Sequence, residues 1–226
     1  GNTINGRLGE YDVLDNIFGL GSSDAFKGVK RIQFVACGTS LHAAKTARKW
    51  FEDLCEIPCY IDFASEYRYR NPIVEDNTLF VTISQSGETA DTLAALEYAR
   101  GEKYVGIVTI CNVPTSTMVR EADWKILTNA GPEIGVASTK AFTTQLAALL
   151  MLALSISKSQ DKNADKRKQA TQELRETPAL VDQSFNLKKK ISQITQNIST
   201  KHNALFLGRG MYFSIAQEGA LKLKEI

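Results

Sequence analysis

Short hydrophobic runs alternate with amphipathic stretches over the first two thirds of the chain. Five runs are rich in β-branched and aromatic residues, as is typical of strands buried on both faces of a parallel sheet: 31–36, 58–63, 79–83, 104–110 and 124–127. The stretches around them predict helices over 41–54, 64–70, 90–100 and 140–157. This alternation predicts right-handed βαβ units. We therefore expect a three-layer αβα domain with a five-stranded, mostly parallel, flavodoxin-like sheet and helices on both faces.

The remaining segments predict how the chain is divided. We expect 1–28 to be an N-terminal arm or an added end, 29–158 the core of the first domain, and 159–202 a helical connector packed on that domain. In the connector, Leu187, Ile191, Ile194 and Ile198 recur at helical spacing, as expected for one apolar stripe of an amphipathic helix.

The last segment, 203–226, repeats the beginning of the first domain. A short apolar run ends in Phe206-Leu207-Gly208-Arg209-Gly210 and precedes a helix, just as 34–38 does. We interpret the chain as a piece of a longer protein, with one complete α/β domain and the first strand and helix of a truncated second one. The apolar residues of the final helix, Ile215, Leu221 and Leu223, are expected to dock on the first domain or on a second copy of the chain.

Composition and charge exclude several classes of protein. The 226 residues carry a net charge of only +2, which argues against binding to nucleic acid or to an anionic membrane surface. Four cysteines and two histidines show no zinc-type spacing, so no metal is expected and a reduced cytoplasmic compartment is the simplest interpretation. The sequence begins without a signal-peptide pattern. The apolar run 147–156 is about half the length of a bilayer span and is interpreted as a buried core helix.

A hydroxyl-rich turn follows the central predicted strand and leads directly into a helix. It contains Ser84, Gln85, Ser86, Gly87, Glu88 and Thr89. Free backbone N–H groups and the positive end of the helix dipole favour an anion at such a place. The alternative is an ordinary N-cap, with Ser86 or Thr89 satisfying the first turn. An N-cap needs only one polar side chain, whereas five of these six residues have one. We therefore favour an anion site.

Two further polar turns follow other elements, Cys37–Ser40 and 135–140. In open parallel sheets, ligands bind outside the carboxyl ends of the strands. We therefore expect the three turns to converge. Since none contains a GKS or GxGxxG pattern, they predict a polyhydroxylated, phosphorylated small molecule rather than a nucleotide.

Four motifs together resemble the isomerase half of the glucosamine-6-phosphate synthase family, the isomerizing glutamine–fructose-6-phosphate aminotransferases, and in particular its bacterial members. They are ACGTS (36–40), SQSGETADT (84–92), GVASTKAF (135–142) and LGRG…EGALKLKEI (207–226). The resemblance covers about Lys30 to Ile226 and implies the sugar isomerase (SIS) fold.

The resemblance implies a role for each matching residue. Ser84, Gln85, Ser86 and Thr89 would hold the phosphate of fructose 6-phosphate or glucosamine 6-phosphate, and Thr39 and Ser40 would bind sugar hydroxyls. Cys37 and Gly38 lie in the same turn, and Cys37 is interpreted as lining the site rather than as a nucleophile. Val136 and Ser138 would contact the other end of the sugar. Glu225 would move a proton between C1 and C2, while Lys222 would orient it or meet charge developing on oxygen. By themselves, Lys222 and Glu225 would be interpreted as a solvated helix face.

The resemblance also implies partners and limits. It implies a homodimer without metal or organic cofactor, and a glutaminase domain in the full-length protein that supplies ammonia. Because that domain and most of the second SIS domain are missing, we expect the chain alone to be inactive. Two alternatives remain: a stand-alone SIS sugar-phosphate isomerase, and a non-catalytic SIS module that binds a sugar phosphate to regulate a partner.

Overall fold

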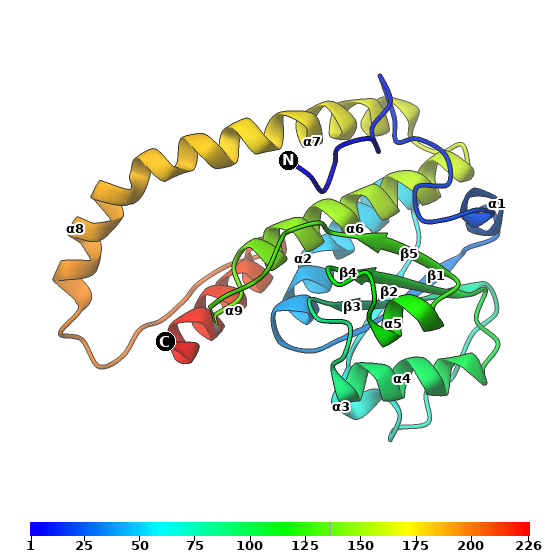
Figure 1. Ribbon diagram of the computed structural model, residues 1–226, viewed down its shortest axis with the longest axis horizontal. Helices are drawn as coiled ribbons and strands as arrows, with labels where there is room; N and C mark the ends of the chain where they lie inside the picture. The colour runs from blue at the N-terminus through cyan, green and yellow to red at the C-terminus, as the bar shows by residue number, and fades with distance from the viewer. Residues whose placement is uncertain (136) are drawn as a thin grey trace.

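A parallel five-stranded sheet lies at the centre of the computed structural model, which describes residues 1–135 and 137–226 (Figure 1). Its strands are β1 (Arg31–Ala36), β2 (Cys59–Phe63), β3 (Thr78–Ser84), β4 (Ile107–Cys111) and β5 (Trp124–Leu127). They lie in the order β2-β1-β3-β4-β5, and every neighbouring pair is parallel. All seven residues of β3 are buried, as its uninterrupted apolar composition predicts. The predicted α/β sheet is confirmed.

Helices cover both faces of this sheet (Figure 1). On one face lie α2 (Gly38–Cys55) and α6 (Lys140–Ser159), together with the short α1 (Ser22–Phe26). On the other lie α3 (Ala64–Tyr67), α4 (Ala90–Arg100) and α5 (Thr117–Glu121). From β1 the chain first adds β2 on one side of the sheet and then returns to add β3 on the other side of β1. The winding of the sheet therefore changes direction between β1 and β3. This reversal is where ligands bind in doubly wound sheets.

Three element boundaries differ from the prediction by three residues, and several others differ by one or two. Helix α2 begins at Gly38 rather than Leu41, so the polar turn 38–40 is itself the first turn of the helix. Helix α3 ends at Tyr67, before Arg70. Strand β4 begins at Ile107 rather than Tyr104, and the Tyr104 side chain packs on Phe80, with the two ring centroids 5.0 Å apart.

The N-terminal residues are part of the first domain's core rather than a separate arm. Val13, Phe18 and Phe26 are buried with the residues of α2 and α6. The N–H of Lys125 in β5 donates to the carbonyl of Phe18 at 2.7 Å. Short buried segments without regular periodicity give no pattern that sequence inspection recognises.

Helix α6 is, by length and composition alone, apolar enough to cross a membrane. Within the fold, 61% of its most apolar window is buried. Its alanine and leucine side chains pack against α2 and the sheet, as the prediction of a core helix requires.

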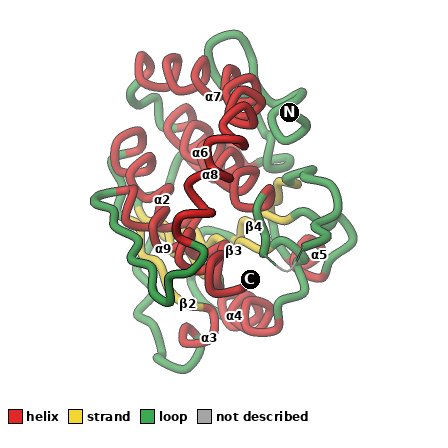
Figure 2. The backbone as a smooth tube through the Cα atoms, turned by 90° about the vertical axis from the view of Figure 1, so that its left-hand side faces the viewer, coloured by secondary structure: helices red, strands yellow, loops and turns green. Residues whose placement is uncertain are grey.

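After α6 the chain extends away from the sheet and returns (Figures 1 and 2). Helix α7 (Ala164–Ser184) packs on α6, and its buried residues are Arg167, Thr171 and Leu174. A short 3₁₀ turn (Phe185–Leu187) and α8 (Lys188–Ile198) follow, and neither contains a buried residue. The predicted apolar stripe therefore exists on a helix, but Ile191, Ile194 and Ile198 are each more than half exposed.

The chain ends in α9 (Met211–Glu225), which lies along α2. The strand expected after Asn203 does not form: residues 203–210 contain no regular element and are exposed. A strand needs a neighbouring strand to satisfy its backbone hydrogen-bonding groups, and no described strand lies beside residues 203–210. Helix α9 docks through Ser214 and Glu218, its only buried residues in the described structure.

Candidate active site

A polar cavity of about 240 Å³ lies at the carboxyl ends of β1 and β3. It is lined by Cys37, Thr39, Ser40, Ile83, Ser84, Gln85, Ser86, Thr89, Thr92, Ser138 and Gln145. Eight of these eleven residues are among those singled out in the sequence. The predicted convergence of the three polar turns is therefore what the structure shows, while Val136 lies outside the described residues.

Hydroxyl groups hold the 84–89 turn in shape. The Ser84 Oγ accepts a hydrogen bond from the Gly87 N–H at 2.9 Å and lies 3.2 Å from the Thr89 Oγ1. The Ser86 Oγ accepts from the Glu88 N–H at 3.2 Å. Thr89 is the N-cap of α4, yet no side-chain hydrogen bond caps that helix. The ordinary capping interpretation is therefore wrong, and the first-turn N–H groups of α4 remain available to a ligand.

Gly87 allows this turn to pack closely against α5. Its φ of +69° is one that side-chain-bearing residues rarely adopt, and a Cβ there would lie 2.7 Å from the Cys111 Sγ and closer still to the Ser116 hydroxyl. The Met118 N–H donates to the Gly87 carbonyl at 3.2 Å. The neighbouring Glu88 carboxylate accepts from the Thr117 N–H, and this hydrogen bond lowers the pKa of Glu88. The turn is thus tied to α5 through the Gly87 carbonyl and the Glu88 side chain.

Two other helices begin near the same cavity. Helix α2 starts at Gly38, whose φ is +52°, and its N-cap Cys37 makes no capping side-chain hydrogen bond. Helix α6 differs, because the Glu133 carboxylate accepts from the Ala141 N–H at 3.2 Å and from the Ser138 hydroxyl at 3.4 Å. A carboxylate already occupies the start of α6, so the starts of α2 and α4 are the places that favour an anion.

A buried carboxylate of α9, that of Glu218, contacts two side chains of α2 beside the cavity. The Glu218 Oε1 accepts from the Thr39 hydroxyl at 2.9 Å, and its Oε2 lies 2.8 Å from the His42 Nδ1. The Glu218 side chain is only 7% exposed. Since Thr39 also lines the cavity, Glu218 connects α9 directly to the wall of the site.

Lys222 extends this network along α9. Its Nζ lies 3.4 Å from the Glu218 Oε1 and 2.6 Å from the Glu225 Oε2. Lys222 and Glu225 do not line the cavity themselves, and Glu225 retains 29% of its side-chain exposure. The two predicted catalytic residues are therefore paired with each other. Lys222 also contacts Glu218, which accepts a hydrogen bond from Thr39 in the cavity wall.

Sequence inspection missed Glu218, although the signal was present. In EGALKLKE, Glu218, Lys222 and Glu225 are spaced i, i+4 and i+7, which places all three on one helix face. His42 gave no such signal, because its partner is 176 residues away in the sequence.

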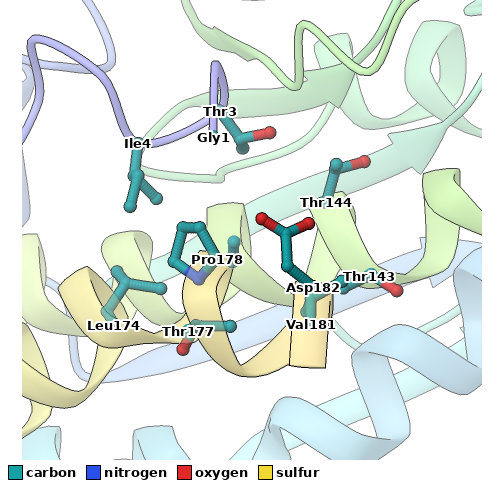
Figure 3. Close-up of a pocket in the computed structure, with 11 residues that line it drawn as sticks. Gly1, Thr3, Ile4, Thr143, Thr144, Leu174, Thr177, Pro178, Val181 and Asp182 are labelled. Carbon is teal, nitrogen blue, oxygen red and sulfur yellow. The ribbon is translucent and has the colours of Figure 1, made fainter. Parts of the chain in front are cut away.

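A second cavity of about 300 Å³ is lined by N-terminal residues and by α6 and α7 (Figure 3). Figure 3 shows side chains such as Ile4, Leu174 and Pro178 facing it, with Asp182 as the titratable side chain among those drawn. None of the residues predicted for the site contributes to it. Its mostly apolar lining offers no group of side chains suited to proton transfer or phosphate binding.

Comparison with known proteins identifies the family. The family model for the SIS domain matches residues 25–155, more than half of the chain. The chain belongs to the SIS domain family. The polar cavity lies within the matched residues, whereas the Glu218–Lys222–Glu225 network lies beyond them.

Relatives similar over the whole chain share one name. Glutamine–fructose-6-phosphate aminotransferases [isomerizing] from Idiomarina loihiensis and Pseudomonas aeruginosa are 51% and 52% identical over 225 residues, covering 100% and 99% of this chain. The solved C-terminal domain of glucosamine-fructose-6-phosphate aminotransferase from Francisella tularensis is 48% identical, with a TM-score of 0.96 over 100% of this chain. This SIS chain spans 37% of the two curated relatives and 63% of the solved one.

Three of the four cysteines of this SIS chain lie in two different environments. Cys37 is half-buried and lines the cavity, as expected, and His42 is engaged with Glu218 rather than with that thiol. Cys55, the last residue of α2, and Cys59, the first residue of β2, are buried, and desolvation raises the pKa of both thiols. Among the described residues no three His, Cys, Asp or Glu side chains are placed to hold a metal ion.

Proposed function

We propose that this chain is the sugar-phosphate-binding, isomerising part of a glucosamine-6-phosphate synthase. The whole protein would convert fructose 6-phosphate and glutamine-derived ammonia to glucosamine 6-phosphate. The observation that carries the proposal is the polar cavity at the starts of α2 and α4, with the Glu218–Lys222–Glu225 network tied to its wall through Thr39.

The phosphate would lie at the start of α4. Ser84, Ser86 and Thr89 surround the first turn of that helix with hydroxyls, and its N–H groups are uncapped. Backbone N–H groups and the helix dipole both favour a dianion there. Gln85 lines the same cavity. Thr39, Ser40 and Ser138 would bind the hydroxyls of the sugar, with Val136 beside them.

Proton transfer would fall to α9. A ketose-to-aldose rearrangement needs one base that removes a proton from C1 and returns it to C2. Glu225 is proposed for that role, with Lys222 orienting its carboxylate and stabilising charge on the substrate oxygen. The 2.6 Å contact between Lys222 and Glu225 supports this pairing. Glu218 would hold Lys222 in place from the other side, because its carboxylate is fixed by Thr39 and His42.

The proposed partners follow from the same assignment. In the full-length protein a glutaminase domain would deliver ammonia, and two copies would form a cytoplasmic homodimer without a metal or organic cofactor. The exposed apolar side chains of α8 and α9, among them Ile191, Ile194, Tyr212 and Phe213, support association with a further surface.

Isothermal calorimetry with fructose 6-phosphate tests the binding part. Replacing Ser86 and Thr89 together by Ala should weaken binding by a few kcal/mol, since each hydrogen bond to a charged group contributes about 1.5–3 kcal/mol. The matched control is Ser192→Ala with Thr195→Ala on the exposed helix α8, which should leave the affinity unchanged. Equal binding of fructose and fructose 6-phosphate by the unmodified chain would refute the placement of the phosphate.

A further inference from the structure

Gln145 is a buried amide on an otherwise apolar helix face. It lies in α6 and is 1% exposed. The residues one and two turns away on the same face, Ala141, Ala148, Leu149 and Leu152, are all buried and apolar. A polar residue in this position therefore interrupts the core-facing stripe of the helix.

The Gln145 Oε1 is buried and has no hydrogen-bond partner among the described residues. A buried acceptor without a donor destabilises the folded state, and an apolar side chain of similar size would remove that penalty. Two other buried side-chain oxygens share this state, those of Ser155 and Thr171. Neither Ser155 nor Thr171 lines the polar cavity, whereas Gln145 does. The unused acceptor of Gln145 therefore belongs to a residue of the site.

We infer that Gln145 recognises the sugar portion of the ligand by turning its amide toward the cavity, because its Oε1 is closed to water-sized molecules in the free chain, and by accepting there a hydrogen bond from one of the sugar hydroxyl groups. The inference rests on the proposed function and adds a residue to it. An acceptor needs a donor, which a sugar hydroxyl supplies and a phosphate dianion does not. The phosphate is bound at the start of α4. Gln145 therefore contacts the sugar, the part of the ligand that inorganic phosphate lacks.

Such a contact gives the site selectivity for a hydroxylated ligand. A site with a buried polar group rejects an analogue that leaves the group unpaired, because the penalty returns in the complex. Gln145 is thus expected to lower stability in the free chain and to contribute to affinity in the complex.

The test compares Gln145→Leu with the unmodified chain, using fructose 6-phosphate and inorganic phosphate as ligands in separate titrations. We expect Gln145→Leu to bind fructose 6-phosphate about tenfold more weakly, which corresponds to about 1.4 kcal/mol. Its affinity for inorganic phosphate should not change. Its melting temperature should be unchanged or higher, since the orphaned acceptor is gone.

Two further variants complete the design. Gln145→Met keeps the unbranched shape of the side chain and should behave like Gln145→Leu even if leucine packs poorly. Ser155→Ala removes another orphaned oxygen from the same helix, away from the cavity, and should leave both affinities unchanged.

The outcomes separate the inference from the proposed function. If the unmodified chain binds fructose 6-phosphate and both Gln145 variants bind it equally well, the role of Gln145 is refuted and the proposed function stands. Equal losses for fructose 6-phosphate and inorganic phosphate would also refute recognition of a hydroxyl. If the unmodified chain does not bind fructose 6-phosphate, the proposed function fails, and the inference fails with it.

Discussion

Replacing Gly87 by Ala should lower the stability of the domain and distort the 84–89 turn. The left-handed φ of +69° costs a side-chain-bearing residue about 1–2 kcal/mol. The added methyl group also meets atoms that cannot easily move: the Ser116 Cβ at 2.5 Å and the Cys111 Sγ at 2.7 Å. Cys111 is buried in β4, and Ser116 is buried at the start of α5.

Overpacking of this kind typically costs a further 1–3 kcal/mol. The two effects together predict a loss of about 2–5 kcal/mol in the free energy of unfolding. For a chain of this size that loss lowers the melting temperature by about 4–20 °C. If the turn moves instead of the neighbours, the same strain appears as weaker binding of the sugar phosphate, because the Ser84–Gly87 hydrogen bond is displaced.

Gly131→Ala is the matched control for this experiment. Its φ of +73° is nearly the same, but no atom lies within 4 Å of the added Cβ, so only the backbone term of about 1–2 kcal/mol should appear. Thermal unfolding by circular dichroism and calorimetric titration with fructose 6-phosphate would be run on both variants. If Gly87→Ala lowers stability no more than Gly131→Ala and binds the ligand normally, the close packing of this turn against α5 is not what shapes the site.

Three further predictions address α9, the buried thiols and turnover. Glu218→Ala leaves Lys222 and Thr39 without their shared acceptor, and breaking a buried charged network of this kind costs about 3 kcal/mol. Hydrogen exchange of the α9 amides should therefore accelerate about 100-fold. Unchanged exchange would contradict the role of Glu218 in anchoring α9. Burial raises the pKa of Cys55 to about 12, so native Cys55 should resist alkylation at pH 8, and its contribution to stability should be present below pH 9 and lost as the pH rises toward 12; alkylation as fast as in the unfolded chain would refute this. The chain alone should bind fructose 6-phosphate yet form almost no glucosamine 6-phosphate in ammonium buffer, whereas a version extended to the length of its relatives should form it; comparable rates would show that residues 1–226 carry the chemistry.

The sheet and the polar cavity are predictable from local sequence because each depends on a run of neighbouring residues. The apolar run ending at Ile83 has the composition of a buried strand, and the hydroxyls from Ser84 to Thr89 then follow its carboxyl end. Parallel pairing with β1 brings the Cys37–Ser40 turn to the same edge. The cavity at this edge therefore follows from the topology.

Contacts between distant segments could not be predicted in the same way. Phe18 contributes to the core through a segment without periodicity, so its role is visible only after β5 is placed beside it. The final helix was expected to dock through Ile215, Leu221 and Leu223, but Ile215 and Leu223 remain exposed. It docks instead through Ser214 and Glu218, because His42 and Thr39 offer polar partners that no pattern within α9 reveals.

This mode of docking divides the candidate site into two parts that differ in how they are held. The proposed phosphate-binding groups belong to β3 and α4, which are fixed by the buried core of the sheet. The proposed proton-transfer groups belong to α9, which is held to α2 by a polar network while Phe213, Ile215 and Leu223 are exposed. A shift of about 1 Å in a catalytic group can cost on the order of 100-fold in rate. We therefore expect a partner that covers the exposed side of α9 to affect the placement of Glu225 more than the binding of the phosphate.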